Sequence, residues 1–148
     1  MSTQKNPIIL IVDDDEMNLS MAKAILETKI QAEYLTAMSG RECLSILEQR
    51  KGLIDLVLLD IAMPGMDGME TLSRIRQNPR LQALPVIFLT AAADKNTIIR
   101  ASQLKINDYV KKPFMPDDLV SRVEKHLKPQ FDDPALNDIF GALDKLGF

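Results

Sequence analysis

The sequence places side chains suited to phosphoryl chemistry directly after short apolar runs. Asp13 and Asp14 follow the first run, Asp60 follows a second, and Thr90 and Lys112 follow two later ones. A carboxylate can act as a nucleophile and form an acyl phosphate, while an ammonium group and a hydroxyl can bind phosphoryl oxygens. If the fold brings these residues together, they predict a site for phosphoryl transfer.

The three acids also predict a cation. Carboxylates held at one place repel one another until a proton or a positive ion relieves the repulsion. All the candidate ligands are oxygen atoms, a set that selects a hard ion, and in a phosphate-handling site this means Mg²⁺, with Mn²⁺ as a substitute. Lys112 would supply a fixed positive charge, paired either with a carboxylate or with a phosphoryl oxygen.

Five apolar runs predict strands, and helical patterns lie between them. The runs are Ile8–Val12, Tyr34–Leu35, Leu56–Leu59, Val86–Leu89 and Tyr109–Val110. Helical faces carry Leu19–Leu26, Cys43–Leu47, Met69–Ile75 and Leu119–Leu127, while the stretch Lys95–Leu104 is the least periodic. Strands that alternate with helices predict an α/β fold with a five-stranded parallel sheet covered on both faces, which is a doubly wound arrangement.

In open sheets of this kind, ligands bind beyond the carboxyl ends of the strands. Every predicted strand except the second is followed by one of the candidate residues. An acid after a buried strand is often only a helix cap or a solvated turn. The joint placement of the acids with Thr90 and Lys112 at one sheet edge nevertheless favours a site over that interpretation.

Composition excludes several classes of protein. The 148 residues suit one domain, and 18 Lys and Arg against 21 Asp and Glu give a net charge of −3, which disfavours diffuse binding to nucleic acid or an anionic membrane. A lone Cys43, expected in the core, and a lone His126, expected to be solvated or favoured by the helix dipole near a helix end, exclude disulfide scaffolds and Cys/His zinc modules. The N-terminus lacks a signal-peptide pattern and no apolar stretch could span a membrane, so we expect a soluble cytoplasmic protein.

Four segments resemble the receiver domain of two-component response regulators over about residues 7–127. They are Ile-Leu-Ile-Val-Asp-Asp at 9–14, Leu-Leu-Asp-Ile-Ala-Met-Pro-Gly-Met-Asp-Gly at 58–68, Phe-Leu-Thr-Ala at 88–91 and Tyr-Val-Lys-Lys-Pro-Phe at 109–114. The resemblance implies a flavodoxin-like strand order, 2-1-3-4-5. It also implies that Lys112 precedes a proline whose peptide bond is commonly cis in the family.

The resemblance further implies a role for each site residue. Asp60 would be the phosphoacceptor, and Mg²⁺ would be bound by Asp14, Asp60, the backbone carbonyl of Ala62 and, through water, Asp13. Thr90 would be the switch hydroxyl, Lys112 the phosphoryl-binding lysine and Tyr109 the aromatic switch residue. An ordinary half-buried strand aromatic is the alternative interpretation of Tyr109.

The function implied is a phosphorylation switch. A sensor histidine kinase or a histidine phosphotransfer protein would donate the phosphoryl group. The face formed by the fourth helix, fifth strand and fifth helix would then engage a downstream protein or output domain, with no direct contact with nucleic acid or membrane. The chain would catalyse only its own phosphorylation and dephosphorylation.

Two alternatives stay open. The first is a small Mg²⁺-dependent phosphatase, although such enzymes usually carry a second acid two residues past the nucleophile, where this chain has Ala62. The second is a docking module that is never phosphorylated, which the complete set of acids, Thr90 and Lys112 disfavours.

Two regions depart from a plain receiver pattern. The family usually has Gly-Ala where this chain has Lys105-Ile106, so the turn before the last strand is expected to differ in shape or carry strain. We assign 1–128 to the receiver domain and 129–148 to a linker with an amphipathic helix. The apolar stripe of that helix would pack on its own domain, form a homodimer or lead toward an output domain.

Overall fold

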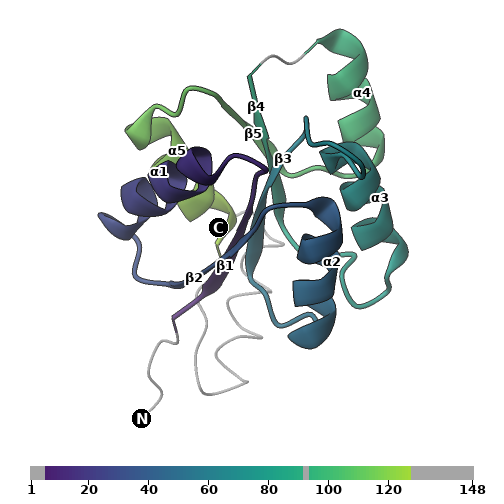
Figure 1. Cartoon of the computed structure of the whole chain (residues 1–148), viewed down its shortest axis with the longest axis horizontal. Coiled ribbons are helices and arrows are strands. Elements are labelled where there is room, and N and C mark those ends of the chain that lie inside the picture. Colours follow the sequence, from purple (N-terminus) through teal and green to yellow (C-terminus); the bar gives the residue numbers. More distant parts are fainter. Residues whose placement is uncertain (1–5, 92–93, 128–148) are drawn as a thin grey trace, which may run out of the picture.

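The computed structural model describes residues 6–91 and 94–127, which fold into one five-stranded sheet with five helices (Figure 1). The elements alternate along the chain: β1 Ile8–Val12, α1 Glu16–Glu27, β2 Glu33–Ala37, α2 Gly40–Gln49, β3 Leu56–Asp60, α3 Gly68–Gln77, β4 Val86–Thr90, α4 Lys95–Gln103, β5 Asp108–Lys111 and α5 Pro116–His126. The alternation of strands and helices is the one that the sequence predicts.

The strand order is β2-β1-β3-β4-β5, and every neighbouring pair is parallel. Helices α1 and α5 cover one face of the sheet, and α2, α3 and α4 cover the other (Figure 1). The predicted doubly wound fold and its strand order are therefore confirmed. The order reverses between β1 and β3, so the carboxyl ends of these two strands lie side by side, where ligands bind in such sheets.

Alternate residues of the central strands enter two separate cores. Leu10 and Val12 of β1 pack with α2 and α3, while Ile9 and Ile11 pack with α1 and α5. The side chains of a strand point alternately to its two faces, so a strand covered on both faces must be apolar throughout. This explains why β1, β3 and β4 have continuous apolar runs.

The weak strand signals belong to the two edges of the sheet. β2 and β5 each fully bury a single residue, Ala37 and Val110 respectively. A strand at an edge is covered on fewer sides than a central one, so it can contain polar residues. The least periodic helix, α4, buries only Ala101, which accounts for its weak pattern in the sequence.

Local signals fix the helix starts. The Ser39 side chain accepts the Glu42 N–H at 3.1 Å and the Asp67 side chain accepts the Glu70 N–H at 2.8 Å, as the spacing predicts. Cys43 lies in the core, where burial raises the pKa of its thiol to about 12.

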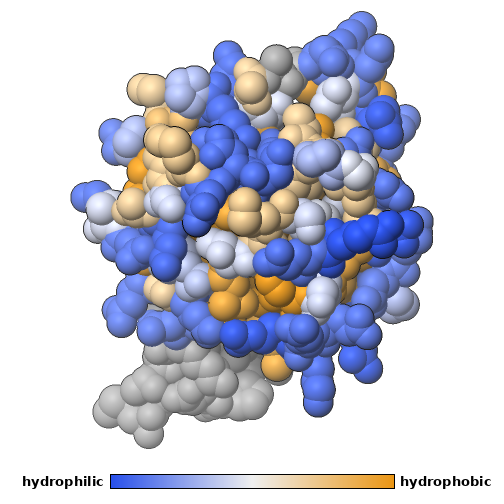
Figure 2. Space-filling view, in the orientation of Figure 1, coloured by the Kyte–Doolittle hydropathy of each residue, from blue (hydrophilic) through white to orange (hydrophobic). Residues whose placement is uncertain are grey.

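The described surface is mostly hydrophilic in the view of Figure 2, with smaller apolar areas between polar side chains. No helix within residues 6–91 and 94–127 is long and apolar enough to cross a membrane. The helix predicted in 129–148 lies outside the described residues, so the boundary at residue 128 stays a prediction.

Candidate functional site

The structure brings Asp13, Asp14 and Asp60 together at the carboxyl end of the sheet. Asp13 and Asp14 directly follow β1, and Asp60 is the last residue of the neighbouring strand β3. Carboxylate oxygens from all three residues lie within 4.8 Å of one another. Because β1 and β3 are parallel neighbours, their carboxyl ends bring residues that are far apart in sequence into one acidic cluster.

The carboxylate of Asp13 is fully buried and held in one orientation. Its Oδ1 accepts the backbone N–H of Asp15 at 2.9 Å. Its Oδ2 has no well-directed hydrogen bond from the described residues, although Lys112 Nζ lies 2.7 Å away as an ion-pair partner. A buried carboxylate oxygen in this state is suited to interact with a further positive group or a water molecule.

Lys112 enters the cluster directly after β5. Its Nζ lies 2.7 Å from Asp13 Oδ2 and 3.1 Å from Asp60 Oδ1. Partial burial alone would lower the pKa of Lys112, but the carboxylates of Asp13 and Asp60 outweigh that effect and raise the pKa. The lysine therefore stays charged and contributes one positive charge to a cluster of three acids. The Lys112-Pro113 bond is cis.

Asp60 is nearly buried, with 4% of its surface exposed. Burial is the largest cause that raises its pKa, followed by the charge of Asp13, and the opposing effect of Lys112 leaves the pKa at about 6. Without a cation, the cluster therefore holds more negative charge than its surroundings stabilise.

Thr90 and Tyr109 lie on the strands next to the cluster. Thr90 ends β4 and is buried, and its carbonyl accepts the Lys112 N–H at 2.8 Å. Tyr109 of β5 is half-buried and packs at the margin of the core, and its hydroxyl donates to the Ile98 carbonyl of α4 at 3.4 Å. The side chain of Tyr109 therefore touches the helix that begins after Thr90.

The donor set fits a hard divalent cation. Three carboxylates converge, and the buried Oδ2 of Asp13 has no well-directed hydrogen bond from the described residues. No thiolate belongs to the cluster in the part of the chain that the structure describes. Mg²⁺ and Mn²⁺ prefer such oxygen ligands. Ala62 lies in the loop directly after β3, close in sequence to Asp60.

Two residues that shape the site were not predicted to do so. Asp15 is the N-cap of α1, accepts the Met17 N–H at 2.9 Å, and orients Asp13 through its own N–H. Gly68 begins α3 so close to β3 that a Cβ atom there would lie 2.2 Å from the Asp60 carbonyl oxygen. The cap could be recognised in the sequence, whereas the close approach at Gly68 depends on the packing of α3.

The opposite end of β5 holds a second charged cluster. The Asp108 carboxylate accepts from the Tyr109 N–H at 2.9 Å, from Arg122 Nη1, and lies 2.9 Å from His126 Nε2. His126 is therefore only slightly exposed, because α5 returns it to the start of β5, and of the two expected roles the solvated one is wrong, while its place in the last turn of α5 agrees with the dipole-favoured one. It lies at the end of the sheet opposite the acidic cluster.

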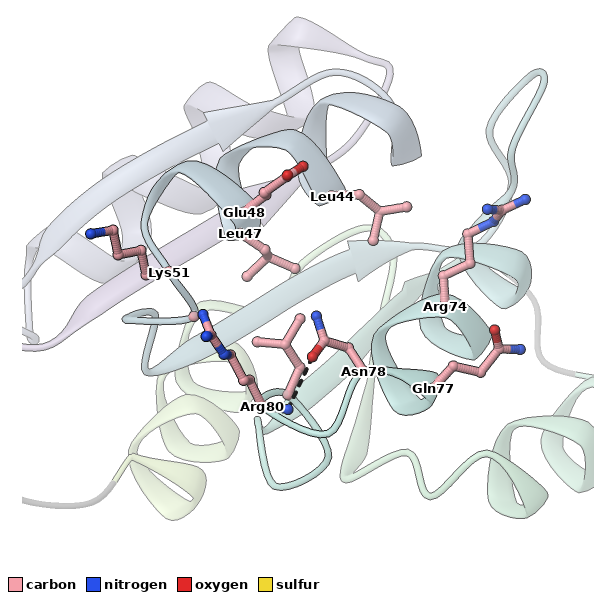
Figure 3. Close-up of a pocket in the computed structure, with 10 residues that line it drawn as sticks. Leu44, Leu47, Glu48, Lys51, Arg74, Gln77, Asn78 and Arg80 are labelled. Carbon is pink, nitrogen blue, oxygen red and sulfur yellow. Dashed lines mark hydrogen bonds between the residues drawn. The ribbon is translucent and has the colours of Figure 1, made fainter.

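A pocket of about 470 Å³ lies between α2 and α3 (Figure 3). Leu47 of α2 and Asn78 at the end of α3 point into it, and Asn78 accepts the Arg80 N–H at 3.0 Å. The predicted site residues do not line this pocket. The pocket and the acidic cluster are therefore separate features of the described part of the chain.

Comparison with known families agrees with this geometry. Residues 9–124 match the family described as the response regulator receiver domain, and they include every predicted site residue. The chain belongs to this family. Receiver domains are signalling domains of two-component systems and do not turn over a free substrate.

Individual relatives cover the same region. The chain is 35% identical over 124 residues to the transcriptional regulatory protein YvrH of Bacillus subtilis, a match that spans 84% of this chain and 50% of that protein. It is 37% identical over 121 residues to the chemotaxis protein CheY-3 of Vibrio cholerae, which covers 82% of this chain and 92% of that one. The chain therefore spans about half the length of YvrH and nearly all of CheY-3.

A solved structure bears on the metal. The Mn²⁺-bound form of the response regulator Rcp1 superposes with a TM-score of 0.68 at 30% identity, over 80% of this chain and 90% of that chain. Receiver domains bind Mg²⁺ and interact with histidine kinases and output domains.

Proposed function

We propose that the chain accepts a phosphoryl group on Asp60 from a phosphohistidine of a sensor histidine kinase or a histidine phosphotransfer protein. The P–N bond of the donor breaks, its electron pair stays on the imidazole nitrogen, and a bond forms between phosphorus and an Asp60 carboxylate oxygen. The observation that carries the proposal is the contact of one ammonium, Lys112, with two of three convergent carboxylates.

The residues around Asp60 would bind the phosphoryl group and the metal ion. Lys112 holds its charge beside Asp60, where it can bind a phosphoryl oxygen as negative charge spreads over the transferred group. Asp14, Asp60, the Ala62 carbonyl and, through water, Asp13 would hold Mg²⁺. The bound ion would neutralise the carboxylates and polarise the phosphoryl oxygens.

The phosphoryl group then acts as a switch. It adds charge and three strong acceptor oxygens next to Lys112 and near Thr90. Capture of the Thr90 hydroxyl would open space under α4, and Tyr109 would turn inward and give up its bond to the Ile98 carbonyl. The face formed by α4, β5 and α5 would thereby change, and a downstream protein or output domain would recognise the change.

The remaining parts of the proposal concern setting. We place the protein in the cytoplasm, with the receiver domain at 1–128 and a segment at 129–148 that would pack on its own domain, form a homodimer contact or lead toward an output domain. Turnover is limited to phosphorylation and dephosphorylation of Asp60 itself.

The first test is phosphorylation of the purified chain by radiolabelled acetyl phosphate with Mg²⁺. We expect Asp60→Asn to abolish labelling, because an amide is a far weaker nucleophile than a carboxylate. Asp55→Asn is the matched control: Asp55 lies just before the opposite end of β3 and accepts the Ile8 N–H at 2.8 Å, and this variant should label as the wild type does. Undiminished labelling of Asp60→Asn would place the acceptor elsewhere.

The second test addresses the metal ligands. Asp14→Ala should weaken Mg²⁺ binding, measured by calorimetry, by roughly tenfold or more, because one of few charged ligands is lost. Asp117→Ala changes an acid of the first turn of α5 and should leave the affinity unaltered. Equal affinity in Asp14→Ala and the wild type would reject the assigned ligand role.

A further inference from the structure

A single arginine connects the C-terminal end of α3 to the turn that follows α4. Arg76 lies in the last turn of α3, and its Nε donates to the Leu104 carbonyl at 3.2 Å. Its Nη2 donates to the Lys105 carbonyl at 3.0 Å and to Asn107 Oδ1 at 3.1 Å. One guanidinium therefore holds the residues that end α4 and lead into β5.

The same guanidinium also holds the connection before β4. Its Nη1 donates to the carbonyls of Leu81, Gln82 and Leu84, at 3.2, 3.3 and 2.8 Å. Asn107 Oδ1 additionally accepts the Val86 N–H at 2.8 Å. The two chain segments that enter β4 and β5 are thus fixed to each other through one planar cation, a geometry that a lysine could not reproduce.

This network lies at the position where the sequence departs from the family pattern. Lys105 has a φ of 58°, in the left-handed region that glycine adopts most easily. The expectation of a strained turn is therefore confirmed in its backbone. The bond from Arg76 to the Lys105 carbonyl holds the turn in this conformation without a glycine.

The rest of α4 is held weakly. Only Ala101 of the helix is buried, and Ile98 and Ile99 are 40% and 45% exposed. Tyr109 reaches the middle of the helix through the bond to the Ile98 carbonyl. A cavity of about 200 Å³ lies beside Arg76, so packing covers the end of the helix on one side only. The C-terminal end of α4 is therefore held by the core contacts of Ala101 and Leu104 together with the hydrogen bonds from Arg76.

We propose that Arg76 is a positioning residue that anchors the C-terminal end of α4 as a pivot, so that switching moves only the N-terminal part of the helix. The inference rests on the proposed function, because the movement would start from Thr90 and Tyr109. With the C-terminal end fixed, a change near Thr90 tilts α4 in one direction. With that end released, the helix would shift or fray in many directions, and the partner-binding face would respond less to phosphorylation.

The test is hydrogen exchange of backbone amides in the full chain, with and without Mg²⁺ and beryllofluoride, a mimic of the phosphoryl group. Without activation, Arg76→Gln should speed exchange of the Lys105 and Ile106 amides by about tenfold or more, since several charge-assisted hydrogen bonds are lost. Arg76→Lys keeps the positive charge, so its exchange rates at these amides should lie between those of the wild type and those of Arg76→Gln. Arg74→Gln is the matched control, because Arg74 lies on the same helix and pairs with exposed Glu70.

Activation separates a pivot from a merely structural role. In the wild type, beryllofluoride should change exchange in residues 95–100 and leave 104–107 unchanged. In Arg76→Gln, the change should extend through 104–107, while Arg74→Gln should behave as the wild type. Exchange at Lys105 and Ile106 within about twofold of the wild type, or acceleration spread evenly over all helices, would overturn the proposal.

The two proposals fail in different ways. A wild type that does not respond to beryllofluoride would contradict the proposed function and the moving end of α4. The anchoring role of Arg76 would still be decided by the exchange rates of the unactivated variants.

Discussion

The two ends of the sheet place a buried aspartate in opposite electrostatic environments. At the carboxyl end, Asp60 lies beside two other acids and shares one lysine with Asp13. At the other end, Asp108 receives hydrogen bonds from the Tyr109 N–H and Arg122 and lies beside His126. Both carboxylates are largely buried, yet one lies among like charges and the other among donors.

The pKa values express this difference. Burial and the charge of Asp13 raise the pKa of Asp60 to about 6. Burial also acts to raise the pKa of Asp108, but the bonds from Tyr109, His126 and Arg122 outweigh it and lower the pKa. Charge at Asp108 therefore stabilises the fold, whereas charge at Asp60 destabilises it until a cation arrives. The site proposed to bind a cation and a phosphoryl group would thus keep reactivity at the expense of stability.

The largest effect is expected from removal of the charge of Asp60. Asp60→Asn should raise the free energy of unfolding at pH 8 without metal by up to about 3 kcal/mol, the energy that a pKa of about 6 against 3.8 represents. Urea unfolding in the presence of EDTA measures it.

A matched variant and the metal sharpen this result. Asp14 belongs to the same cluster but is exposed, so Asp14→Asn should stabilise the protein by less than about 1 kcal/mol. Added Mg²⁺ should narrow the gap between Asp60→Asn and the wild type, because the ion binds only the intact cluster well. A less stable Asp60→Asn variant would remove the contrast between the two ends of the sheet.

The side chains at the carboxyl end of the sheet could be predicted from the sequence better than those at the opposite end, for a physical reason. The strands β1, β3 and β4 are covered on both faces, so continuous apolar runs marked them, and the parallel fold then carried Asp13 and Asp60 to one edge. Each acid of that cluster either ends a strand or lies within two residues of its end, so its position could be predicted from the sequence.

The opposite end depends on contacts that no pattern records. The sequence carries no signal that singles out Arg76, and it predicts His126 to be solvated or favoured by the helix dipole. Their partners stand up to 31 residues away, as Asn107 does from Arg76, and are set by how helices return to strand ends. Backbone carbonyls are acceptors at every residue, so the sequence does not indicate which ones a guanidinium will meet.

A smaller effect of opposite sign is expected at the second aspartate. Asp108→Asn should lower the free energy of unfolding by about 2 kcal/mol, because Arg122 and His126 lose a charged, largely buried partner. The control is Asp118→Asn, since Asp118 pairs with Arg122 in an exposed contact between residues four apart, worth a few tenths of a kcal/mol. Equal losses in the two variants would show that Asp108 is no more important than a surface acid.

The wild type, Asp60→Asn and Asp108→Asn should also differ in how their stability depends on pH. The folded-state pKa of Asp108 is lowered, so its stabilisation is present above the unfolded value of about 4 and is lost as the pH falls through the folded value. The wild type should therefore lose part of its advantage over Asp108→Asn as the pH falls below about 4. The folded-state pKa of Asp60 is raised, so its contribution is present below about pH 4 and is lost as the pH rises through about 6. Relative to Asp60→Asn, the wild type should lose stability over that higher pH range.

Urea titrations of all three proteins in EDTA measure the free energy of unfolding at each pH. They should show two separate pH ranges in which stability changes with opposite slopes, and a single common range would mean that the two aspartates experience the same environment.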